Sequence, residues 1–168
     1  IMYAGNLGTP QNIESFINTF STSSKEYNLT IFGSGSQYQK ICDLSNSFIK
    51  VNQYVSREKL AILTSEIPFA LVSLSAEITI EGFPGKTFDY LKMNKILIGY
   101  SNSASSLAKF IEKYQLGINI DPDHKDIDIK LSMLEDEIFL NQIYSNISEM
   151  NNHFASVDLV VKQYMKLI

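Results

Sequence analysis

The sequence has little cysteine, a small share of basic residues and no long apolar run. Its single cysteine, Cys42, cannot form an internal disulfide, which predicts a protein of a reducing compartment. The 14 basic residues are outnumbered by 18 acidic ones, so we expect no nucleic-acid partner, which would need many clustered cations. The richest apolar stretch, residues 60–74, is broken by polar side chains, so no transmembrane segment is expected.

Proline and glycine are also scarce, at 4 and 8 of 168 residues, which excludes collagen-like and low-complexity chains. There is no internal repeat and no linker-like tract, so the length predicts about one domain. The chain begins Ile1-Met2-Tyr3-Ala4-Gly5, which has the pattern of a β-strand and lacks the basic start of a signal peptide. We therefore expect a domain of a longer protein, whose remainder lies on the N-terminal side.

Short β-branched runs alternate with amphipathic segments along the first two thirds of the chain. The strands are predicted at residues 1–4, 29–32, 48–52, 69–74, 95–99 and 117–120, and the helices between them at 11–20, 37–45, 58–63, 86–93 and 106–113. This alternation is typical of a doubly wound, mostly parallel six-stranded α/β sheet with helices on both faces. Extra C-terminal helices are predicted at 127–134, 135–150 and 157–168, with Ser132 and Glu135 as a capping box.

In such a sheet, ligands bind beyond the carboxyl ends of the strands, so candidate sites lie where a strand meets a helix. The first junction, residues 5–10, holds Gly5 and Gly8, which allow close approach of a ligand, and Thr9 as a helix cap before Pro10. It favours an anion site or, equally, a plain tight turn. The third, residues 51–56, offers Gln53, Tyr54 and Val55 to a nucleobase, although a plain loop fits as well.

The fourth junction, residues 75–90, is the most distinctive. Carboxylates at Glu81 and Asp89 flank a helix start, and Lys86 lies in its first turn. A cation near a helix N-terminus is disfavoured by the helix dipole, so Lys86 is better explained by an anionic partner than by a solvated turn.

Other patterns are absent. Residues 33–35 lack the third glycine of a dinucleotide fingerprint, because position 38 is Tyr38, and Asn52 replaces the acidic residue that would hold the ribose. His124 and His153 belong to no set of ligands. We therefore predict neither a metal nor a bound cofactor.

Together, the segments 3–8, 29–35, 84–91 and 95–98 resemble the nucleotide-sugar-binding, C-terminal half of a GT-B glycosyltransferase, and most closely glycosyltransferase family 4. That family carries two glutamates separated by seven residues, and here the same spacing joins Glu81 to Asp89. The resemblance covers nearly the whole chain. It implies one half of a GT-B fold, with an acceptor-binding N-terminal domain outside this sequence.

The resemblance also implies roles for single residues. Asp89 would hold the ribose of the donor, and Glu81, with Glu77 as a rival, would contact the sugar that is transferred. Backbone N–H groups around Phe83, Pro84 and Gly85 would bind sugar and phosphate. The turn containing Gly5, Asn6 and Gly8, together with Lys86, would cradle the diphosphate, and residues 53–55 would meet the base.

This sequence departs from the family pattern at two places. Members usually carry an Arg and a Lys in the first turn, where Asn6 and Gln11 stand here, so Lys86, helix dipoles and backbone donors would have to meet the phosphate charge. Asp89 stands where the family has the longer glutamate.

We therefore expect the donor-binding domain of a retaining hexosyltransferase that uses a nucleoside-diphosphate sugar and a glycan or lipid-linked acceptor in bacterial surface polysaccharide (capsule or lipopolysaccharide) synthesis. It would be cytoplasmic, or peripheral to the inner membrane in its full-length form, and inactive alone. Two alternatives stay open: a GT-B nucleotide-sugar epimerase or phosphorylase, and an interaction module that has lost its ligand.

Overall fold

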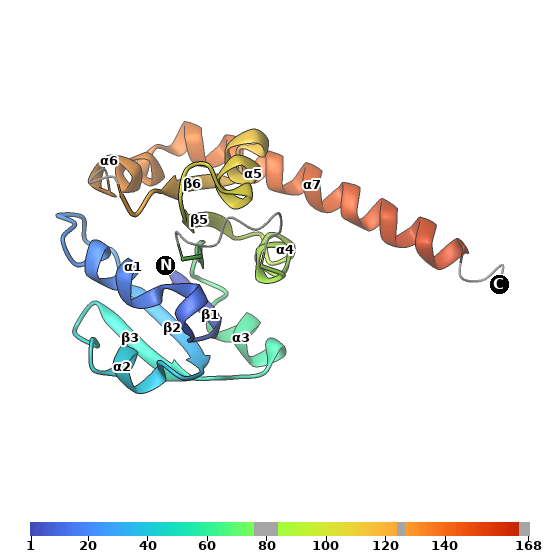
Figure 1. Cartoon of the computed structure of the whole chain (residues 1–168). Helices are drawn as coiled ribbons and strands as arrows, with labels where there is room; N and C mark the ends of the chain where they lie inside the picture. Colours follow the sequence, from blue (N-terminus) through green and yellow to red (C-terminus); the bar gives the residue numbers. More distant parts are fainter. Residues whose placement is uncertain (76–83, 124–126, 165–168) are drawn as a thin grey trace.

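Six parallel strands, in the order β3-β2-β1-β4-β5-β6, form the sheet of the computed structural model, which describes residues 1–75, 84–123 and 127–164, and side chains only as far as residue 153 (Figure 1). The strands are β1 (Met2–Asn6), β2 (Leu29–Ser34), β3 (Ile49–Gln53), β4 (Phe69–Ser73), β5 (Ile96–Tyr100) and β6 (Gly117–Ile120). All six predicted strands are confirmed within two residues at each end. All five strand pairs are parallel, as the alternation predicts.

The helices between the strands are η1 (Thr9–Gln11), α1 (Ile13–Phe20), α2 (Tyr38–Cys42), α3 (Arg57–Leu63), α4 (Lys86–Lys92) and α5 (Ser106–Tyr114). After β3 the chain crosses back over β2 and β1 to begin β4. Because parallel crossovers are right-handed, α3, α4 and α5 cover the face opposite to α1 and α2. Strands β4 and β5 are buried along their whole length, as expected of a parallel sheet covered on both faces.

The spacing of apolar residues in helix α1 predicts both that the segment is helical and which of its faces packs on the sheet. Its residues Ile13, Phe16, Ile17 and Phe20 recur at helical spacing, and all four are buried against the sheet. The ring of Phe16 also packs edge-on against Tyr100 of β5, with centroids 5.3 Å apart. This packing joins the two halves of the sheet.

The start of this first helical segment differs from the prediction. Thr9 does not cap α1, because residues Thr9–Gln11 form a separate turn of 3₁₀ helix that is capped by Gly8. The Gln11 side chain accepts a hydrogen bond from the Gly8 N–H at 3.2 Å, and Asn12 then adopts a left-handed conformation before α1 begins. The extra turn thus stabilises the loop between β1 and α1 by hydrogen bonds among the loop's own residues.

The C-terminal region also differs. Residues beyond β6 form α6 (Ile127–Ser132), η2 (Met133–Glu135) and one long helix, α7 (Glu137–Tyr164), where two helices were predicted. No glycine or proline occurs between residues 150 and 157, so nothing local ends the helix. The cap is Asp136 instead of the Ser132 and Glu135 pair, because its carboxylate accepts from the N–H groups of Ile138 and Phe139. Figure 1 shows α7 extending well past the sheet.

Candidate functional site

A crevice opens at the point where the strand order reverses, between β1 and β4. Strand β1 pairs with β2 over five residues, but with β4 it pairs only through Met2 and Ala70. The two strands therefore diverge towards their carboxyl ends. Ligands of doubly wound sheets bind at this kind of switch point.

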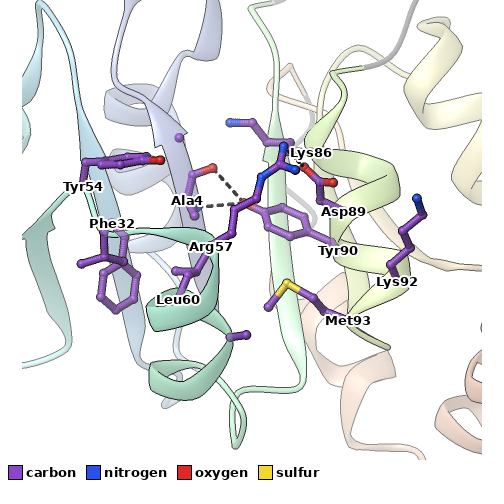
Figure 2. Close-up of a pocket in the computed structure, with 13 residues that line it drawn as sticks. Ala4, Phe32, Tyr54, Arg57, Leu60, Lys86, Asp89, Tyr90, Lys92 and Met93 are labelled. Atoms are coloured by element: carbon purple, nitrogen blue, oxygen red, sulfur yellow. Dashed lines mark hydrogen bonds and ion pairs between the residues drawn. The ribbon is translucent and has the colours of Figure 1, made fainter.

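The crevice contains a cavity of about 460 Å³ on the face covered by α3 and α4 (Figure 2). The cavity is lined by residues of β1, β2, the β3–α3 junction, α3 and α4: Ala4, Gly5, Phe32, Tyr54, Val55, Arg57, Leu60, Ala61, Lys86, Asp89, Tyr90, Lys92 and Met93. Five sequence-predicted residues are thus brought together: Gly5, Tyr54, Val55, Lys86 and Asp89. The volume and the mostly apolar lining with a few polar groups are typical of small-molecule sites.

Tyr90 fixes α4 to the diverging edge of β1. Its hydroxyl accepts a hydrogen bond from the N–H of Ala4 at 2.8 Å and donates one to the Ala4 carbonyl at 3.1 Å (Figure 2). These are the backbone groups that β4 would satisfy if the strands stayed paired. The Tyr90 side chain is 2% exposed, and burial raises the pKa of its hydroxyl. A single side chain thus keeps the crevice open without leaving the strand edge unsatisfied.

Replacing Tyr90 by phenylalanine should therefore lower the free energy of unfolding by about 1–3 kcal/mol, because two half-buried backbone groups of Ala4 lose their partner. Urea denaturation would measure the change. Tyr144→Phe is the matched control, because Tyr144 is exposed, and it should stay within about 0.5 kcal/mol of wild type. Equal stability of the two variants would contradict this role for the hydroxyl.

Lys86 lies at the centre of the site, next to Gly5. The Lys86 ammonium donates to the Tyr3 hydroxyl at 2.7 Å and lies 3.9 Å from the centroid of the Tyr3 ring. Gly5 has φ +144°, and a Cβ at that position would come within 2.8 Å of Lys86 Nζ. A glycine is therefore needed here both for the backbone conformation and for the space that the ammonium occupies.

The charge of Lys86 has no carboxylate partner among the residues that the structure describes. Burial lowers its pKa from 10.5 to about 8, so the side chain is still mostly protonated at neutral pH. A desolvated cation of this kind is stabilised by an anionic ligand. The prediction that Lys86 needs an anionic partner is consistent with this environment.

Asp89 lies one turn further along α4, with 47% of its side chain exposed, and faces Arg57 of α3 across the crevice. The Arg57 Nη2 and Asp89 Oδ2 atoms are 3.4 Å apart, and the Arg57 side chain is 84% exposed. Surface pairs of this kind contribute about 0–1 kcal/mol. Both side chains can therefore exchange this contact for a ligand.

Tyr54 and Val55 form the opposite wall, directly after β3. The Tyr54 ring is 65% exposed and lies above Phe32 at the edge of the cavity (Figure 2). Ser56, which follows Val55, caps α3: its side-chain oxygen accepts a hydrogen bond from the Lys59 N–H at 3.3 Å. This cap fixes the start of α3, and with it the position from which the Arg57 side chain extends into the cavity.

Other predicted residues do not line the cavity. Gln53, Asn6, Gly8, Pro84 and Gly85 are absent from its walls. In the first turn the Asn6 amide donates to Gln11 Oε1 at 3.3 Å, so this pair holds the loop together at the positions where basic residues were expected. Glu81, its rival Glu77, and Phe83 lie outside the described residues.

Sequence reasoning missed Arg57, Lys92 and the apolar floor formed by Phe32, Leu60 and Met93. A usable signal was present for Arg57: it is the only arginine in the chain, and it directly follows Ser56, a residue type that caps helices, at a strand-to-helix junction. The apolar floor could not be recognised in the sequence, because its residues come from three separate segments that meet only after the chain crosses back to β4.

In the part of the chain that the structure describes, no group of three or more His, Cys, Asp or Glu side chains could hold a metal ion. His124 lies outside that part. In the same part, no helix combines the length and the apolar character needed to cross a membrane.

Comparison with solved structures finds this fold in glycosyltransferases. The catalytic domain of cholesterol-α-glucosyltransferase from Helicobacter pylori aligns with a TM-score of 0.68 and 13% identity, over 92% of this chain and 98% of that one. Lipopolysaccharide outer core galactosyltransferase WaaB gives 0.64 and 16%, over 92% of this chain and 48% of that one. Anabaena HepE in complex with UDP-glucose gives 0.67 and 12%, over 99% and 49%.

The chain thus spans about half the length of WaaB and of HepE. No protein-family model matches the sequence, and no curated protein matches it. The fold predicted from the sequence is confirmed: the described residues form a six-stranded, all-parallel, Rossmann-like α/β fold, which the glycosyltransferase domains named above share.

Proposed function

We propose that the chain is the donor-binding domain of a retaining glycosyltransferase that transfers a hexose from a nucleoside-diphosphate sugar to a glycan or lipid-linked acceptor. The observation that carries this proposal is the switch-point cavity, in which the unpaired ammonium of Lys86 and the carboxylate of Asp89 lie on one helix. A cation for phosphate and a carboxylate for hydroxyl groups are the two chemistries that a nucleoside diphosphate requires.

The lining residues can be assigned to the parts of the donor. The base would lie against the exposed ring of Tyr54 and the backbone of Val55, above the apolar floor. Asp89 would accept hydrogen bonds from the ribose hydroxyls. The diphosphate would lie near Gly5, where the absence of a side chain leaves the Lys86 ammonium accessible to it.

The chemistry would be activation of the leaving group. As the glycosidic bond breaks, negative charge develops on the departing diphosphate, and the desolvated Lys86 ammonium would stabilise it. Glu81 remains our candidate for contact with the transferred sugar. Surface polysaccharide synthesis in a bacterial cytoplasm is the setting that we propose, and the names of WaaB and HepE's UDP-glucose complex support the substrate class. The acceptor would be held by a second domain.

Calorimetric titration of the chain with UDP and GDP, and with uridine and guanosine as uncharged controls, tests the proposal. We expect one diphosphate to bind at micromolar to millimolar concentration and its nucleoside to bind at least tenfold more weakly, because the nucleoside makes no charged contacts. Absence of binding by both diphosphates, or equal binding of nucleoside and diphosphate, would contradict it. The anomeric configuration of the product of the full-length enzyme, read by NMR, would test retention.

A further inference from the structure

The chain's only arginine, Arg57, lines the cavity at the switch point of the sheet. Arg57 is the first residue of α3, and Figure 2 shows its side chain crossing from α3 towards Lys86 and Asp89 on α4. Its guanidinium lies 3.4 Å from the Asp89 carboxylate. The backbone of Arg57 thus lies on the α3 wall of the crevice, opposite to Lys86, and its guanidinium reaches across the cavity to the α4 wall.

The charge of the cavity differs in sign from that of the chain. Among its described lining residues are three cations, Arg57, Lys86 and Lys92, and one carboxylate, Asp89, for a net charge of +2. The whole chain carries −4. An acidic protein that gathers its sole arginine and two lysines around one cavity creates a local positive field, which attracts an anion.

The first turn contributes no cation to this field. Asn6 and Gln11 occupy the positions where a basic pair was expected, and they bond to each other. The N–H of Gly8 is also engaged, by Gln11 Oε1. The diphosphate of a donor would therefore find its second cation elsewhere in the site.

We propose that Arg57 is that cation: it binds the diphosphate of the donor from α3, opposite Lys86, in place of basic residues in the first turn. This inference rests on the function proposed above. A guanidinium has five N–H donors, so Arg57 can contact a phosphate oxygen while it still touches Asp89. Because most of its side chain is exposed, it can reach the ligand without disturbing the core.

A different role for Arg57, in which it only shields the Asp89 carboxylate, predicts the opposite change in nucleotide affinity when Arg57 is removed. If Arg57 only covered Asp89, its removal would free the carboxylate for the ribose, and nucleotide binding would become tighter. If Arg57 binds phosphate, its removal weakens the binding of the diphosphate and has little effect on the nucleoside.

The test compares Arg57→Gln with Lys59→Gln by calorimetric titration with UDP, GDP and the two nucleosides. Lys59 lies on the same helix, is exposed and does not line the cavity, so it controls for the loss of one positive charge. We expect Arg57→Gln to weaken diphosphate binding by about tenfold to a hundredfold, and nucleoside binding by less than about threefold. Its diphosphate affinity should also depend less on salt than that of wild type.

Unchanged or tighter diphosphate binding by Arg57→Gln would overturn the inference, and so would an equal loss in Lys59→Gln. If wild type binds a diphosphate and Arg57→Gln binds it equally well, only the role of Arg57 is wrong. If wild type binds neither diphosphate, the proposed function fails, and this inference fails with it. Unchanged thermal unfolding of both variants would confirm that the fold is intact.

Discussion

Replacing Lys86 by methionine should stabilise the fold and, at the same time, remove most of the affinity for a nucleoside diphosphate. The stabilisation follows from burial: the pKa of Lys86 falls from 10.5 to about 8, which means that folding desolvates its charge. At about 1.4 kcal/mol per pH unit, removing that charge should raise the free energy of unfolding by about 1–3 kcal/mol at pH 7. Tyr3 keeps a partner, because its hydroxyl donates to the Asn6 carbonyl at 2.6 Å.

The difference in stability between wild type and Lys86→Met should decrease as the pH rises. Below pH 8 Lys86 is charged in both the folded and the unfolded chain, so the full penalty is present. Between pH 8 and about 10 the folded chain gives up this proton before the unfolded chain does, so wild type becomes more stable relative to Lys86→Met. The difference between the two proteins should therefore shrink over that range. Urea denaturation at pH 7, 8, 9 and 10 measures it.

The affinity for a nucleoside diphosphate should change over the same pH range. An anionic ligand favours protonated Lys86, so wild type should bind the diphosphate progressively more weakly as the pH rises above 8, by up to about tenfold per unit. Lys86→Met should bind about a hundredfold more weakly than wild type at pH 7, with no such dependence. Lys109→Met, on the exposed side of α5, is the control and should match wild type throughout. A destabilised Lys86→Met, or one with wild-type affinity, would contradict this account.

The Asp89→Ala variant should lose about tenfold to a hundredfold in affinity for the same diphosphate, because a carboxylate contributes about 1.5–3 kcal/mol through charged hydrogen bonds to hydroxyl groups. Asp89 is half-exposed and its ion pair with Arg57 is weak, so the fold should be unaffected. Titration of both proteins at pH 7 measures the loss.

A dideoxynucleoside diphosphate separates the ribose contact from other causes. Wild type should bind it as weakly as Asp89→Ala binds the normal ligand, and Asp89→Ala should bind both ligands equally. If Asp89 instead only repels phosphate, Asp89→Ala will bind more tightly than wild type, and the assignment to ribose is wrong.

The sheet could be predicted from the sequence because each parallel strand is a short β-branched run between helical segments. Strand β6 has the predicted bounds, residues 117–120, and α3 and α4 each begin or end within one residue of prediction. The long α7 could not be predicted as one helix, because polar residues around 151–156 weaken the apolar period without stopping the helix. Helix continuity there depends on the absence of a breaker rather than on a pattern.

The candidate site was predictable in part for the same reason. Gly5, Tyr54, Lys86 and Asp89 all belong to segments that join a strand to the next helix or to the first turn of that helix, and these segments meet at the carboxyl edge of a parallel sheet. The hydroxyl of Tyr90 could not be assigned from sequence, because its partner Ala4 is exposed only where β1 separates from β4. The pairing of Arg57 with Asp89 likewise depends on where two helices lie in space.

The bond between Tyr90 and Ala4 affects how much order the site must gain when a ligand binds. Tyr90 joins α4 to β1 at two backbone atoms, and Lys86 and Asp89 lie on that same short helix. Their backbone positions are therefore set before any ligand arrives, and little conformational entropy is lost on the α4 side. Arg57, on an exposed side chain opposite, must give up most of its rotamers. The entropy of binding is thus divided unequally: one wall of the crevice is preorganised, and the other adapts.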